Sequence, residues 1–145
     1  RPDGPVGLDF GVICFSDNFT GLDKSGRFQV RLTSPANYDC WKQASPSEYT
    51  SMKREWSERI GNISSEIIGN YRENIVYHDF FTPVTIEKFT GKAKGAVYGS
   101  PVKIKDGRSS YENLFIAGTD QGYLGIVGAM LSGVTMVNHH ILEKI

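Results

Sequence analysis

The clearest pattern in the first half of the sequence is a stripe of apolar side chains that recur every three or four residues. This spacing places them on one face of an α-helix, with charged residues turned to water. The stripe consists of Tyr49, Met52, Trp56, Ile60, Ile63, Ile67 and Tyr71. Ser45 can cap the helix, Pro46 suits its first position, and Glu48 completes a capping box. The sequence therefore predicts a packing helix over about 46–71, continuous through Gly61.

Three segments have the composition of β-strands. Residues 7–15 are an apolar run typical of a buried strand, and residues 28–32 alternate apolar with polar side chains, as in a half-buried strand. Residues 74–81 (NIVYHDFF) are a third candidate. We expect an antiparallel or mixed sheet that the long helix covers.

The last third of the chain combines short elements with many glycines. A Thr-Pro pair begins a short helix over 82–89. Residues 113–117 (NLFIA) are predicted to form a strand, followed by a glycine turn at 118–122 and a helix over about 124–143. Together they predict a βα unit whose backbone a ligand can approach closely. The expected fold class is α/β in the broad sense (α+β): a mixed or antiparallel sheet, one long covering helix, and this final βα unit.

Composition and charge exclude some function classes. The 145 residues carry 16 Lys+Arg and 16 Asp+Glu, a balance that argues against general electrostatic binding of nucleic acid. A hydrophobic content of 39% is enough to bury a core. The longest apolar stretch, 123–137, contains glycines and is shorter than the ~20 residues that span a bilayer. Cys14 and Cys40 lack neighbours at zinc-ligand spacing and are interpreted as free thiols of a reducing, cytoplasmic compartment.

A local basic stretch surrounds the glycine-bearing loop at 95–100. It consists of Lys92, Lys94, Lys103, Lys105 and Arg108. The simpler interpretation is a solvated loop. The alternative is contact with anionic lipid head groups, which would suit an enzyme peripheral to a membrane.

The start of the last predicted helix is the main candidate for chemistry. The first amides of a helix lack internal partners and carry partial positive charge, so they stabilise a phosphate or the carbonyl edge of a flavin. Gly125 and Gly128 have no side chain to hold such a ligand away, and Asp120 can accept hydrogen bonds from sugar hydroxyls or backbone amides. The alternative is that these glycines only permit close packing on a sheet. Neither GxGxxG nor GxxxxGK[ST] occurs in the sequence.

Other reactive side chains are assigned no catalysis. Adjacent strand residues point to opposite faces, so His78 and Asp79 are not expected to cooperate. His139 and His140 fall in the last turns of the final helix, where positive charge suits the helix dipole. Ser132 has no evident base, which argues against a serine hydrolase. No metal site is predicted, and no catalytic residue is named.

Three segments, in order along the chain, match motifs of one family. Residues 29–41 (QVRLTSPANYDCW) are similar to a strand that leads to a Tyr and a Trp before a long helix. Residues 82–91 (TPVTIEKFTG) and 95–99 (GAVYG) resemble a TPxTxxRYTG…GAxYG block. Residues 113–120 (NLFIAGTD) and 125–133 (GIVGAMLSG) resemble a terminal flavin-contacting strand and helix. The chain thus resembles the C-terminal part of the phytoene desaturase, carotenoid isomerase and retinol saturase group of FAD-dependent oxidoreductases, within the flavin amine oxidase superfamily.

This resemblance implies roles for particular residues. Asp120 would approach the ribityl or phosphate part of FAD, above a turn shaped by its two preceding residues. Backbone amides around Ile126 and Val127 would face the isoalloxazine carbonyl edge, and Tyr98 and Gly99 would lie near the flavin or the substrate tunnel. The implied cofactor-binding set is Gly118, Thr119, Asp120, Gly125, Ile126, Val127, Gly128 and Ala129. The chain departs from the family at 121–124, where a proline-glycine-glycine run is usual, and at Lys88-Phe89, where Arg-Tyr is usual.

The resemblance also implies a longer enzyme, whose N-terminal Rossmann unit contacts the FAD pyrophosphate through GxGxxG. We therefore expect a fragment: residues 1–100 as the end of a substrate-side domain, and residues 101–145 as the strand and helix that return to the FAD-binding domain. The whole enzyme would act as a dehydrogenase, desaturase or isomerase on a polyene or lipid-like substrate, with hydride transfer to flavin. The chain alone would bind FAD poorly and turn over nothing.

Two alternatives stay open. The chain could be a non-catalytic α/β binding or interaction module derived from such an enzyme, or a fragment of an amine-oxidising flavoenzyme, because amine oxidases share the end motif. The expected partners are FAD, an apolar small-molecule substrate and a second copy bound through exposed apolar surface, but not nucleic acid. The expected location is cytoplasmic or peripheral to a membrane.

Overall fold

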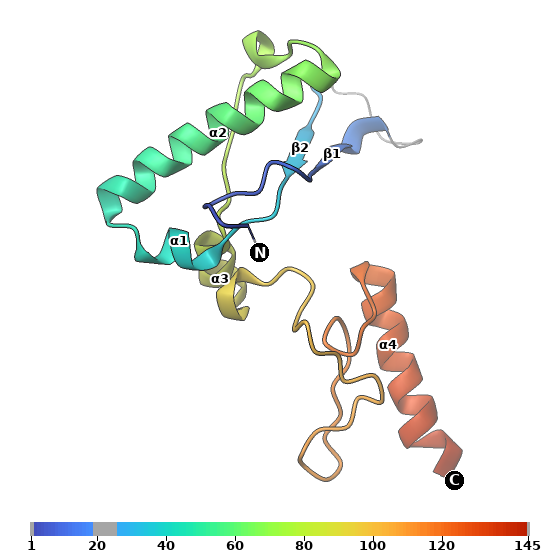
Figure 1. Cartoon of the computed structure of the whole chain (residues 1–145). Helices are drawn as coiled ribbons and strands as arrows, with labels where there is room; N and C mark the ends of the chain where they lie inside the picture. Colours follow the sequence, from blue (N-terminus) through green and yellow to red (C-terminus); the bar gives the residue numbers. More distant parts are fainter. Residues whose placement is uncertain (1, 19–25, 145) are drawn as a thin grey trace. The chain divides into compact units, whose positions relative to one another are not determined.

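The computed structural model describes residues 2–18 and 26–144 of a chain that divides into two compact units, Arg1–Gly95 and Ala96–Ile145 (Figure 1). In the described residues the strands and helices are, in chain order, β1 (Val12–Phe15), β2 (Val30–Thr33), α1 (Tyr38–Gln43), α2 (Pro46–Ile68), α3 (Pro83–Thr90) and α4 (Gly125–His140). Short 3-10 turns occur at η1 (Ser16–Asn18), η2 (Arg72–Asn74), η3 (Ala93–Gly95) and η4 (Leu142–Lys144). This combination of helices with a small antiparallel sheet confirms the α+β class.

The long helix predicted from the apolar stripe is confirmed as α2. Its capping box is complete, because the Ser45 hydroxyl accepts from the Glu48 amide while the Glu48 carboxylate accepts from the Ser45 amide at 2.8 Å. Gly61 does not interrupt the helix, and a Cβ there would lie 3.3 Å from Nε of Arg72, which packs across it. The helix ends before Gly69, whose φ is 88°, so it is slightly shorter than predicted.

The core of the first unit lies beneath α2. Val6, Trp41 and Trp56 are buried together, and the apolar residues packed against them are Leu8, Tyr49, Met52, Ile60, Phe80 and Val84. Trp41 is 1% exposed, and its indole N–H donates to the Pro5 carbonyl at 2.9 Å. Trp41 belongs to α1, a six-residue helix that the sequence analysis did not predict. The buried face of α2 therefore packs on α1, α3 and the N-terminal segment.

The sheet is smaller than predicted. β1 and β2 pair antiparallel, from Val12 opposite Thr33 to Phe15 opposite Val30. The prediction of a buried strand over 7–15 is wrong in its extent and burial, because four residues pair and β1 is half-buried to exposed. Among the described residues only these two strands pair, and a two-stranded ladder buries little of its side-chain surface by itself.

Two other predicted strands are wrong. Asn74 ends the 3-10 turn η2, and residues 75–81 belong to no strand in the described part of the chain. Residues 113–117 form one isolated bridge, between Arg108 and Phe115, and Asn113 has a φ of 62° that interrupts an extended path. A segment becomes a β-strand only when it pairs with another strand, and the apolar composition of the segment does not show whether such a partner exists. The predicted βα unit is therefore corrected to a turn followed by a helix.

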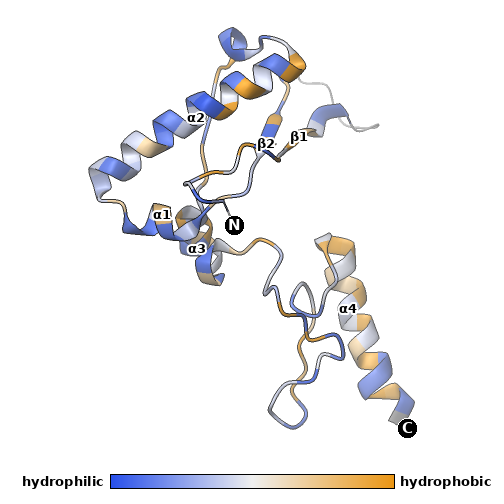
Figure 2. Cartoon of the chain, in the orientation of Figure 1, coloured by the Kyte–Doolittle hydropathy of each residue, from blue (hydrophilic) through white to orange (hydrophobic). Residues whose placement is uncertain are grey.

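The two remaining helix predictions are confirmed. The Thr82 hydroxyl caps α3 by accepting from the Thr85 amide at 3.2 Å. α4 begins at Gly125, next to the predicted position, and ends at His140, before η4. Figure 2 shows that much of α4 is apolar, whereas α2 is largely hydrophilic. Among the described helices, none is long and apolar enough to cross a membrane.

Candidate functional site

A tight turn at residues 118–122 is held from below by a buried polar network. Ser132 of α4 is 0% exposed; its hydroxyl accepts from the Gly118 amide at 2.6 Å and donates to the Gln121 side-chain oxygen. Gln121 is 2% exposed and donates from its side-chain nitrogen to the Lys105 carbonyl at 2.9 Å. Buried polar groups are costly unless each has a partner, so this network fixes the turn on the helix.

The segment that contains Tyr98 and Gly99 packs against this turn. The Ser100 amide donates to Oδ1 of Asp120 at 2.6 Å. Gly99 has a φ of 73°, and a Cβ at this position would overlap the same carboxylate oxygen. A glycine is therefore required here both by the backbone conformation and by the close approach of Asp120.

Lys103 bridges the same two segments. Its ammonium donates to the Tyr98 carbonyl at 2.5 Å and to the Thr119 carbonyl at 2.9 Å, and the neighbouring Ile104 amide donates to the Asp120 carbonyl at 3.0 Å. An ammonium can donate three hydrogen bonds, so one side chain joins two loop backbones. The loop at 98–104 and the turn at 118–122 thus form one structure.

A second contact fixes the loop to the far end of α4. Gly107 has a φ of 67°, and a Cβ there would overlap the Met136 sulfur. Nε2 of His140 donates to the Asp106 carbonyl at 2.6 Å, and its ring stacks on Phe115 with centroids 4.3 Å apart. His140 thus has a structural role.

The start of α4 is open. Leu124 occupies the N-cap position and supplies no side-chain hydrogen bond to the first turn. Within the described residues, no atom lies within 4 Å of the position that a Cβ on Gly125 or Gly118 would take. Ile126 and Val127 are 83% and 69% exposed. Gly128 instead lies close to Tyr123: a Cβ on Gly128 would be 3.3 Å from the Tyr123 carbonyl carbon, so this glycine serves close packing as well.

The structure brings together some of the residues singled out from the sequence. Tyr98 and Gly99 lie against Thr119 and Asp120, and Gly118 is tied to α4 through Ser132. The contacts that hold the turn do not include Gly125, Ile126, Val127 or Ala129. These four residues follow the turn in the chain and lie at the open start of α4.

Three positioning residues were missed: Lys103, Gln121 and Ser132. The sequence interpretation places Lys103 in a basic stretch, Ser132 among the small residues of the last helix, and Gln121 in the glycine turn, and it gives none of these side chains a positioning role. The one signal in the sequence is the four-residue spacing of Gly128, Ser132, Met136 and His140, which marks the buried face of α4.

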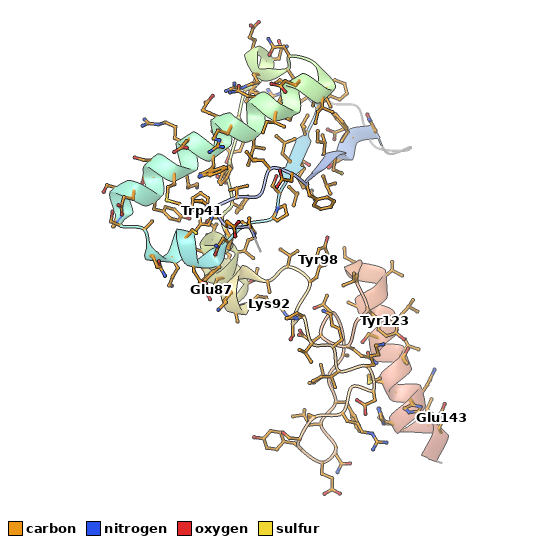
Figure 3. All side chains as sticks on the ribbon, viewed as in Figure 1. Trp41, Glu87, Lys92, Tyr98, Tyr123 and Glu143 are labelled. Atoms are coloured by element: carbon orange, nitrogen blue, oxygen red, sulfur yellow. The ribbon has the colours of Figure 1, made fainter. Side chains whose placement is uncertain are left out.

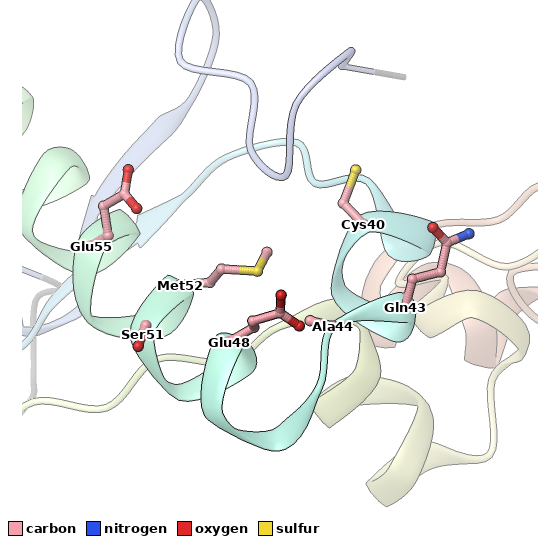
Figure 4. A pocket seen from close by; sticks show the side chains of 7 residues that line it. All are labelled: Cys40, Gln43, Ala44, Glu48, Ser51, Met52 and Glu55. Atoms are coloured by element: carbon pink, nitrogen blue, oxygen red, sulfur yellow. The ribbon is translucent and has the colours of Figure 1, made fainter.

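Other parts of the molecule offer less chemistry. An open groove of about 450 Å³ lies between α1 and α2 beside Cys40 and Met52 (Figure 4). Its carboxylates are engaged, Glu48 in the α2 cap and Glu55 in an ion pair with Arg59 at 3.6 Å. In the first unit, His78 contacts the Ser57 hydroxyl at 3.0 Å, whereas the Asp79 carboxylate accepts from the next amide. No group of metal-ligating side chains occurs in the described ranges.

Comparisons with family models, with curated proteins and with solved structures find no match to this chain.

Proposed function

We propose that the chain is the C-terminal part of an FAD-dependent oxidoreductase related to the phytoene desaturase group. The observation that carries this proposal is the convergence of two motifs. Gly99 closely approaches Asp120, the Ser100 amide donates to the Asp120 carboxylate, and Lys103 joins the Tyr98 carbonyl to the Thr119 carbonyl, about twenty residues away in sequence. This structure precedes the open start of α4. The sequence resemblance implies that Asp120 contacts FAD and that Tyr98 and Gly99 lie near the flavin or the substrate tunnel.

The geometry of the second unit fits a flavin. Gly118 and Gly125 leave the backbone accessible, with φ values of 92° and 74°. The uncapped first amides of α4 favour negative charge at the flavin carbonyl edge. Asp120 already accepts from Ser100, and a carboxylate has further lone pairs for a ribityl hydroxyl. When bound, FAD supplies the hydride acceptor for the reaction.

The chain's own residues leave part of the cofactor without contacts. No GxGxxG sequence is present to hold the pyrophosphate. We therefore propose that the isolated chain binds FAD weakly and is inactive, and that the activity belongs to a longer protein. The assignment of the second unit to an FAD-binding domain is part of the same proposal.

The surface beside the site supports the proposed substrate class. Val97, Tyr98 and Val102 are exposed next to the fixed turn. An apolar rim of this kind suits a polyene or lipid-like substrate, taken to a desaturated, dehydrogenated or isomerised product. An amine substrate of the kind that amine oxidases use is the alternative, and a charged amine would leave this rim without complementary partners.

Sequencing the native transcript upstream of Arg1 tests the proposal. We expect the reading frame to continue into a strand–GxGxxG–helix unit. A start codon directly before Arg1 would contradict the proposal and favour a non-catalytic binding module, which the exposed apolar face of α4 also suits.

Flavin content of the longer protein then tests the site itself. Gly125→Ala should lower the FAD that co-purifies, because a side chain enters the open backbone at the start of α4. Gly69→Ala is the matched control, since Gly69 of the first unit also has a positive φ, 88°, and open space around the position of a Cβ. Equal FAD content in both variants, with unchanged helix content by circular dichroism, would exclude the start of α4 as a flavin contact.

A further inference from the structure

The segment from Lys88 to Lys94, here named the Lys–Phe turn, folds back tightly at the end of α3. The Gly91 amide donates to the Glu87 carbonyl at 2.9 Å, and the Gly95 amide donates to the Lys92 carbonyl at 3.0 Å. Lys94 has a φ of 55°, which a residue other than glycine rarely adopts. A Cβ on Gly95 would overlap the Pro83 carbonyl, so the end of the turn lies against the beginning of α3.

Glu87 fixes this turn to the rest of the first unit. Its Oε1 accepts from the Lys94 amide at 3.0 Å, and its Oε2 accepts from the Tyr38 hydroxyl at 2.5 Å. The Lys42 ammonium lies 3.7 Å from Oε2. The hydrogen bond from Tyr38, and then that from the Lys94 amide, lower the pKa of Glu87 below its ordinary value of 4.5. The one acidic side chain of this helix is therefore occupied within the fold, close to Lys92 (Figure 3).

The surface of the turn combines cations with one aromatic ring. Lys88, Lys92 and Lys94 are exposed, and Phe89 between them is 74% exposed. The Lys88 ammonium lies 5.7 Å from the centroid of the Phe89 ring. An apolar ring that protrudes among lysines on a rigid turn complements a surface that is anionic outside and apolar beneath.

We propose that the Lys–Phe turn docks on an anionic lipid surface, with its lysines at the head groups and Phe89 at the boundary with the acyl chains. This proposal does not rest on the flavin. It also revises the sequence interpretation, in which the basic stretch extended to Arg108. Lys103 donates to two backbone carbonyls of the second unit, and Arg108 lies 3.9 Å from Asp106.

A lipid surface is favoured over nucleic acid by charge and by the ring. The chain has no net charge, and its cation cluster is small, whereas nucleic-acid binding depends on many phosphate contacts. Three lysines and one ring give reversible binding that weakens with salt, because a single membrane signal is marginal.

Co-sedimentation of the whole chain with vesicles tests the proposal. Binding is expected to phosphatidylcholine vesicles that contain phosphatidylserine, and not to phosphatidylcholine alone. Each lysine near an anionic surface contributes about fivefold in affinity, so Lys92→Gln combined with Lys94→Gln should weaken binding more than tenfold. Phe89→Ser should weaken it further, and circular dichroism should show unchanged helix content in each variant.

Two matched variants make the test specific. Lys105→Gln with Arg108→Gln removes two cations from the second unit, and Phe81→Ser removes an exposed ring outside the turn. Both should bind vesicles as the unchanged chain does. Equal loss in these controls, or equal binding to neutral vesicles, would overturn the proposal. Binding to duplex DNA that depends on Lys92 and Lys94 but not on Phe89 would overturn it in favour of general polyanion binding.

Discussion

The two longest helices of this chain are built for opposite surroundings. α2 begins with a complete capping box, buries Trp56 and turns charged side chains such as Glu58 and Arg59 to solvent. α4 begins without a side-chain cap and exposes a continuous apolar face. That exposed face consists of Ile126, Val127, Met130, Leu131, Val134 and Val137.

The face of α4 that is buried is the smaller one. Ser132, Met136 and His140 follow at four-residue steps and contact the loops of the second unit. Val127, Met130, Val134, Val137 and Ile141 follow at alternating steps of three and four on the exposed side. Exposed apolar patches of this kind mark surfaces that another protein surface covers. The polar face of α2 therefore suits water, whereas we expect a second protein surface to cover the exposed apolar face of α4.

The largest expected effect comes from removing the exposed face of α4. We expect the 145-residue chain to self-associate, and Val127→Ser with Met130→Gln and Val134→Ser to abolish this. Each apolar side chain that becomes fully buried contributes about 1.5 kcal/mol or more, which is about tenfold in affinity. Sedimentation equilibrium over a range of concentrations measures the change.

The control for this variant lies in the first unit. Val76 and Tyr77 are also highly exposed, and Val76→Ser with Tyr77→Ser removes that surface instead. This control should associate as the unchanged chain does. A chain that is monomeric at every concentration, with a cooperative melt, would show that α4 needs no cover and would favour an independent binding module.

The contrast between the helices also explains what the sequence could predict. α2 and α3 follow from local signals, because a cap residue and an early proline act within one segment, and α4 follows from an apolar, small-residue stretch after a glycine turn. The segments 74–81 and 113–117 have strand composition, but a strand is completed by a partner far away in sequence. The short helix α1 carries one buried anchor, Trp41, which is too little for a periodic pattern.

The candidate site likewise contains residues that the sequence could indicate and residues that it could not. Tyr98, Gly99 and Asp120 were found through motif resemblance, and glycine at 99 is explained by its close approach to Asp120. Lys103 and Gln121 were missed because their partners are backbone carbonyls of distant residues. A side chain that bonds to backbone leaves no pairwise signal in a single sequence.

Removing the N-cap of α2 and adding one to α4 should change the free energy of unfolding by smaller amounts and in opposite directions. Ser45→Ala removes the α2 cap and should cost about 1 kcal/mol of unfolding free energy, whereas Leu124→Ser should gain up to about 1 kcal/mol. Leu124 already has the extended conformation of an N-cap residue, with φ −102° and ψ 152°, so a serine hydroxyl can accept from the first turn. Urea denaturation measures both. A loss in stability for Leu124→Ser would mean that the amides of α4 are satisfied without a cap.

The smallest expected effect is a pH dependence confined to α2. Two hydrogen bonds, first from the Ser45 hydroxyl and then from the Ser45 amide, lower the pKa of Glu48 below its ordinary value of 4.5. A carboxyl group whose pKa is lowered by folding stabilises the folded chain above that ordinary value, and this contribution is lost as pH falls through the lowered value. Acid should therefore increase amide hydrogen exchange in the first turn of α2 but not at the start of α4, where no carboxylate caps the helix. Glu48→Gln should remove this difference in acid sensitivity, because its amide side chain does not titrate. If the variant keeps the acid sensitivity of the unchanged chain, the capping box is not its cause.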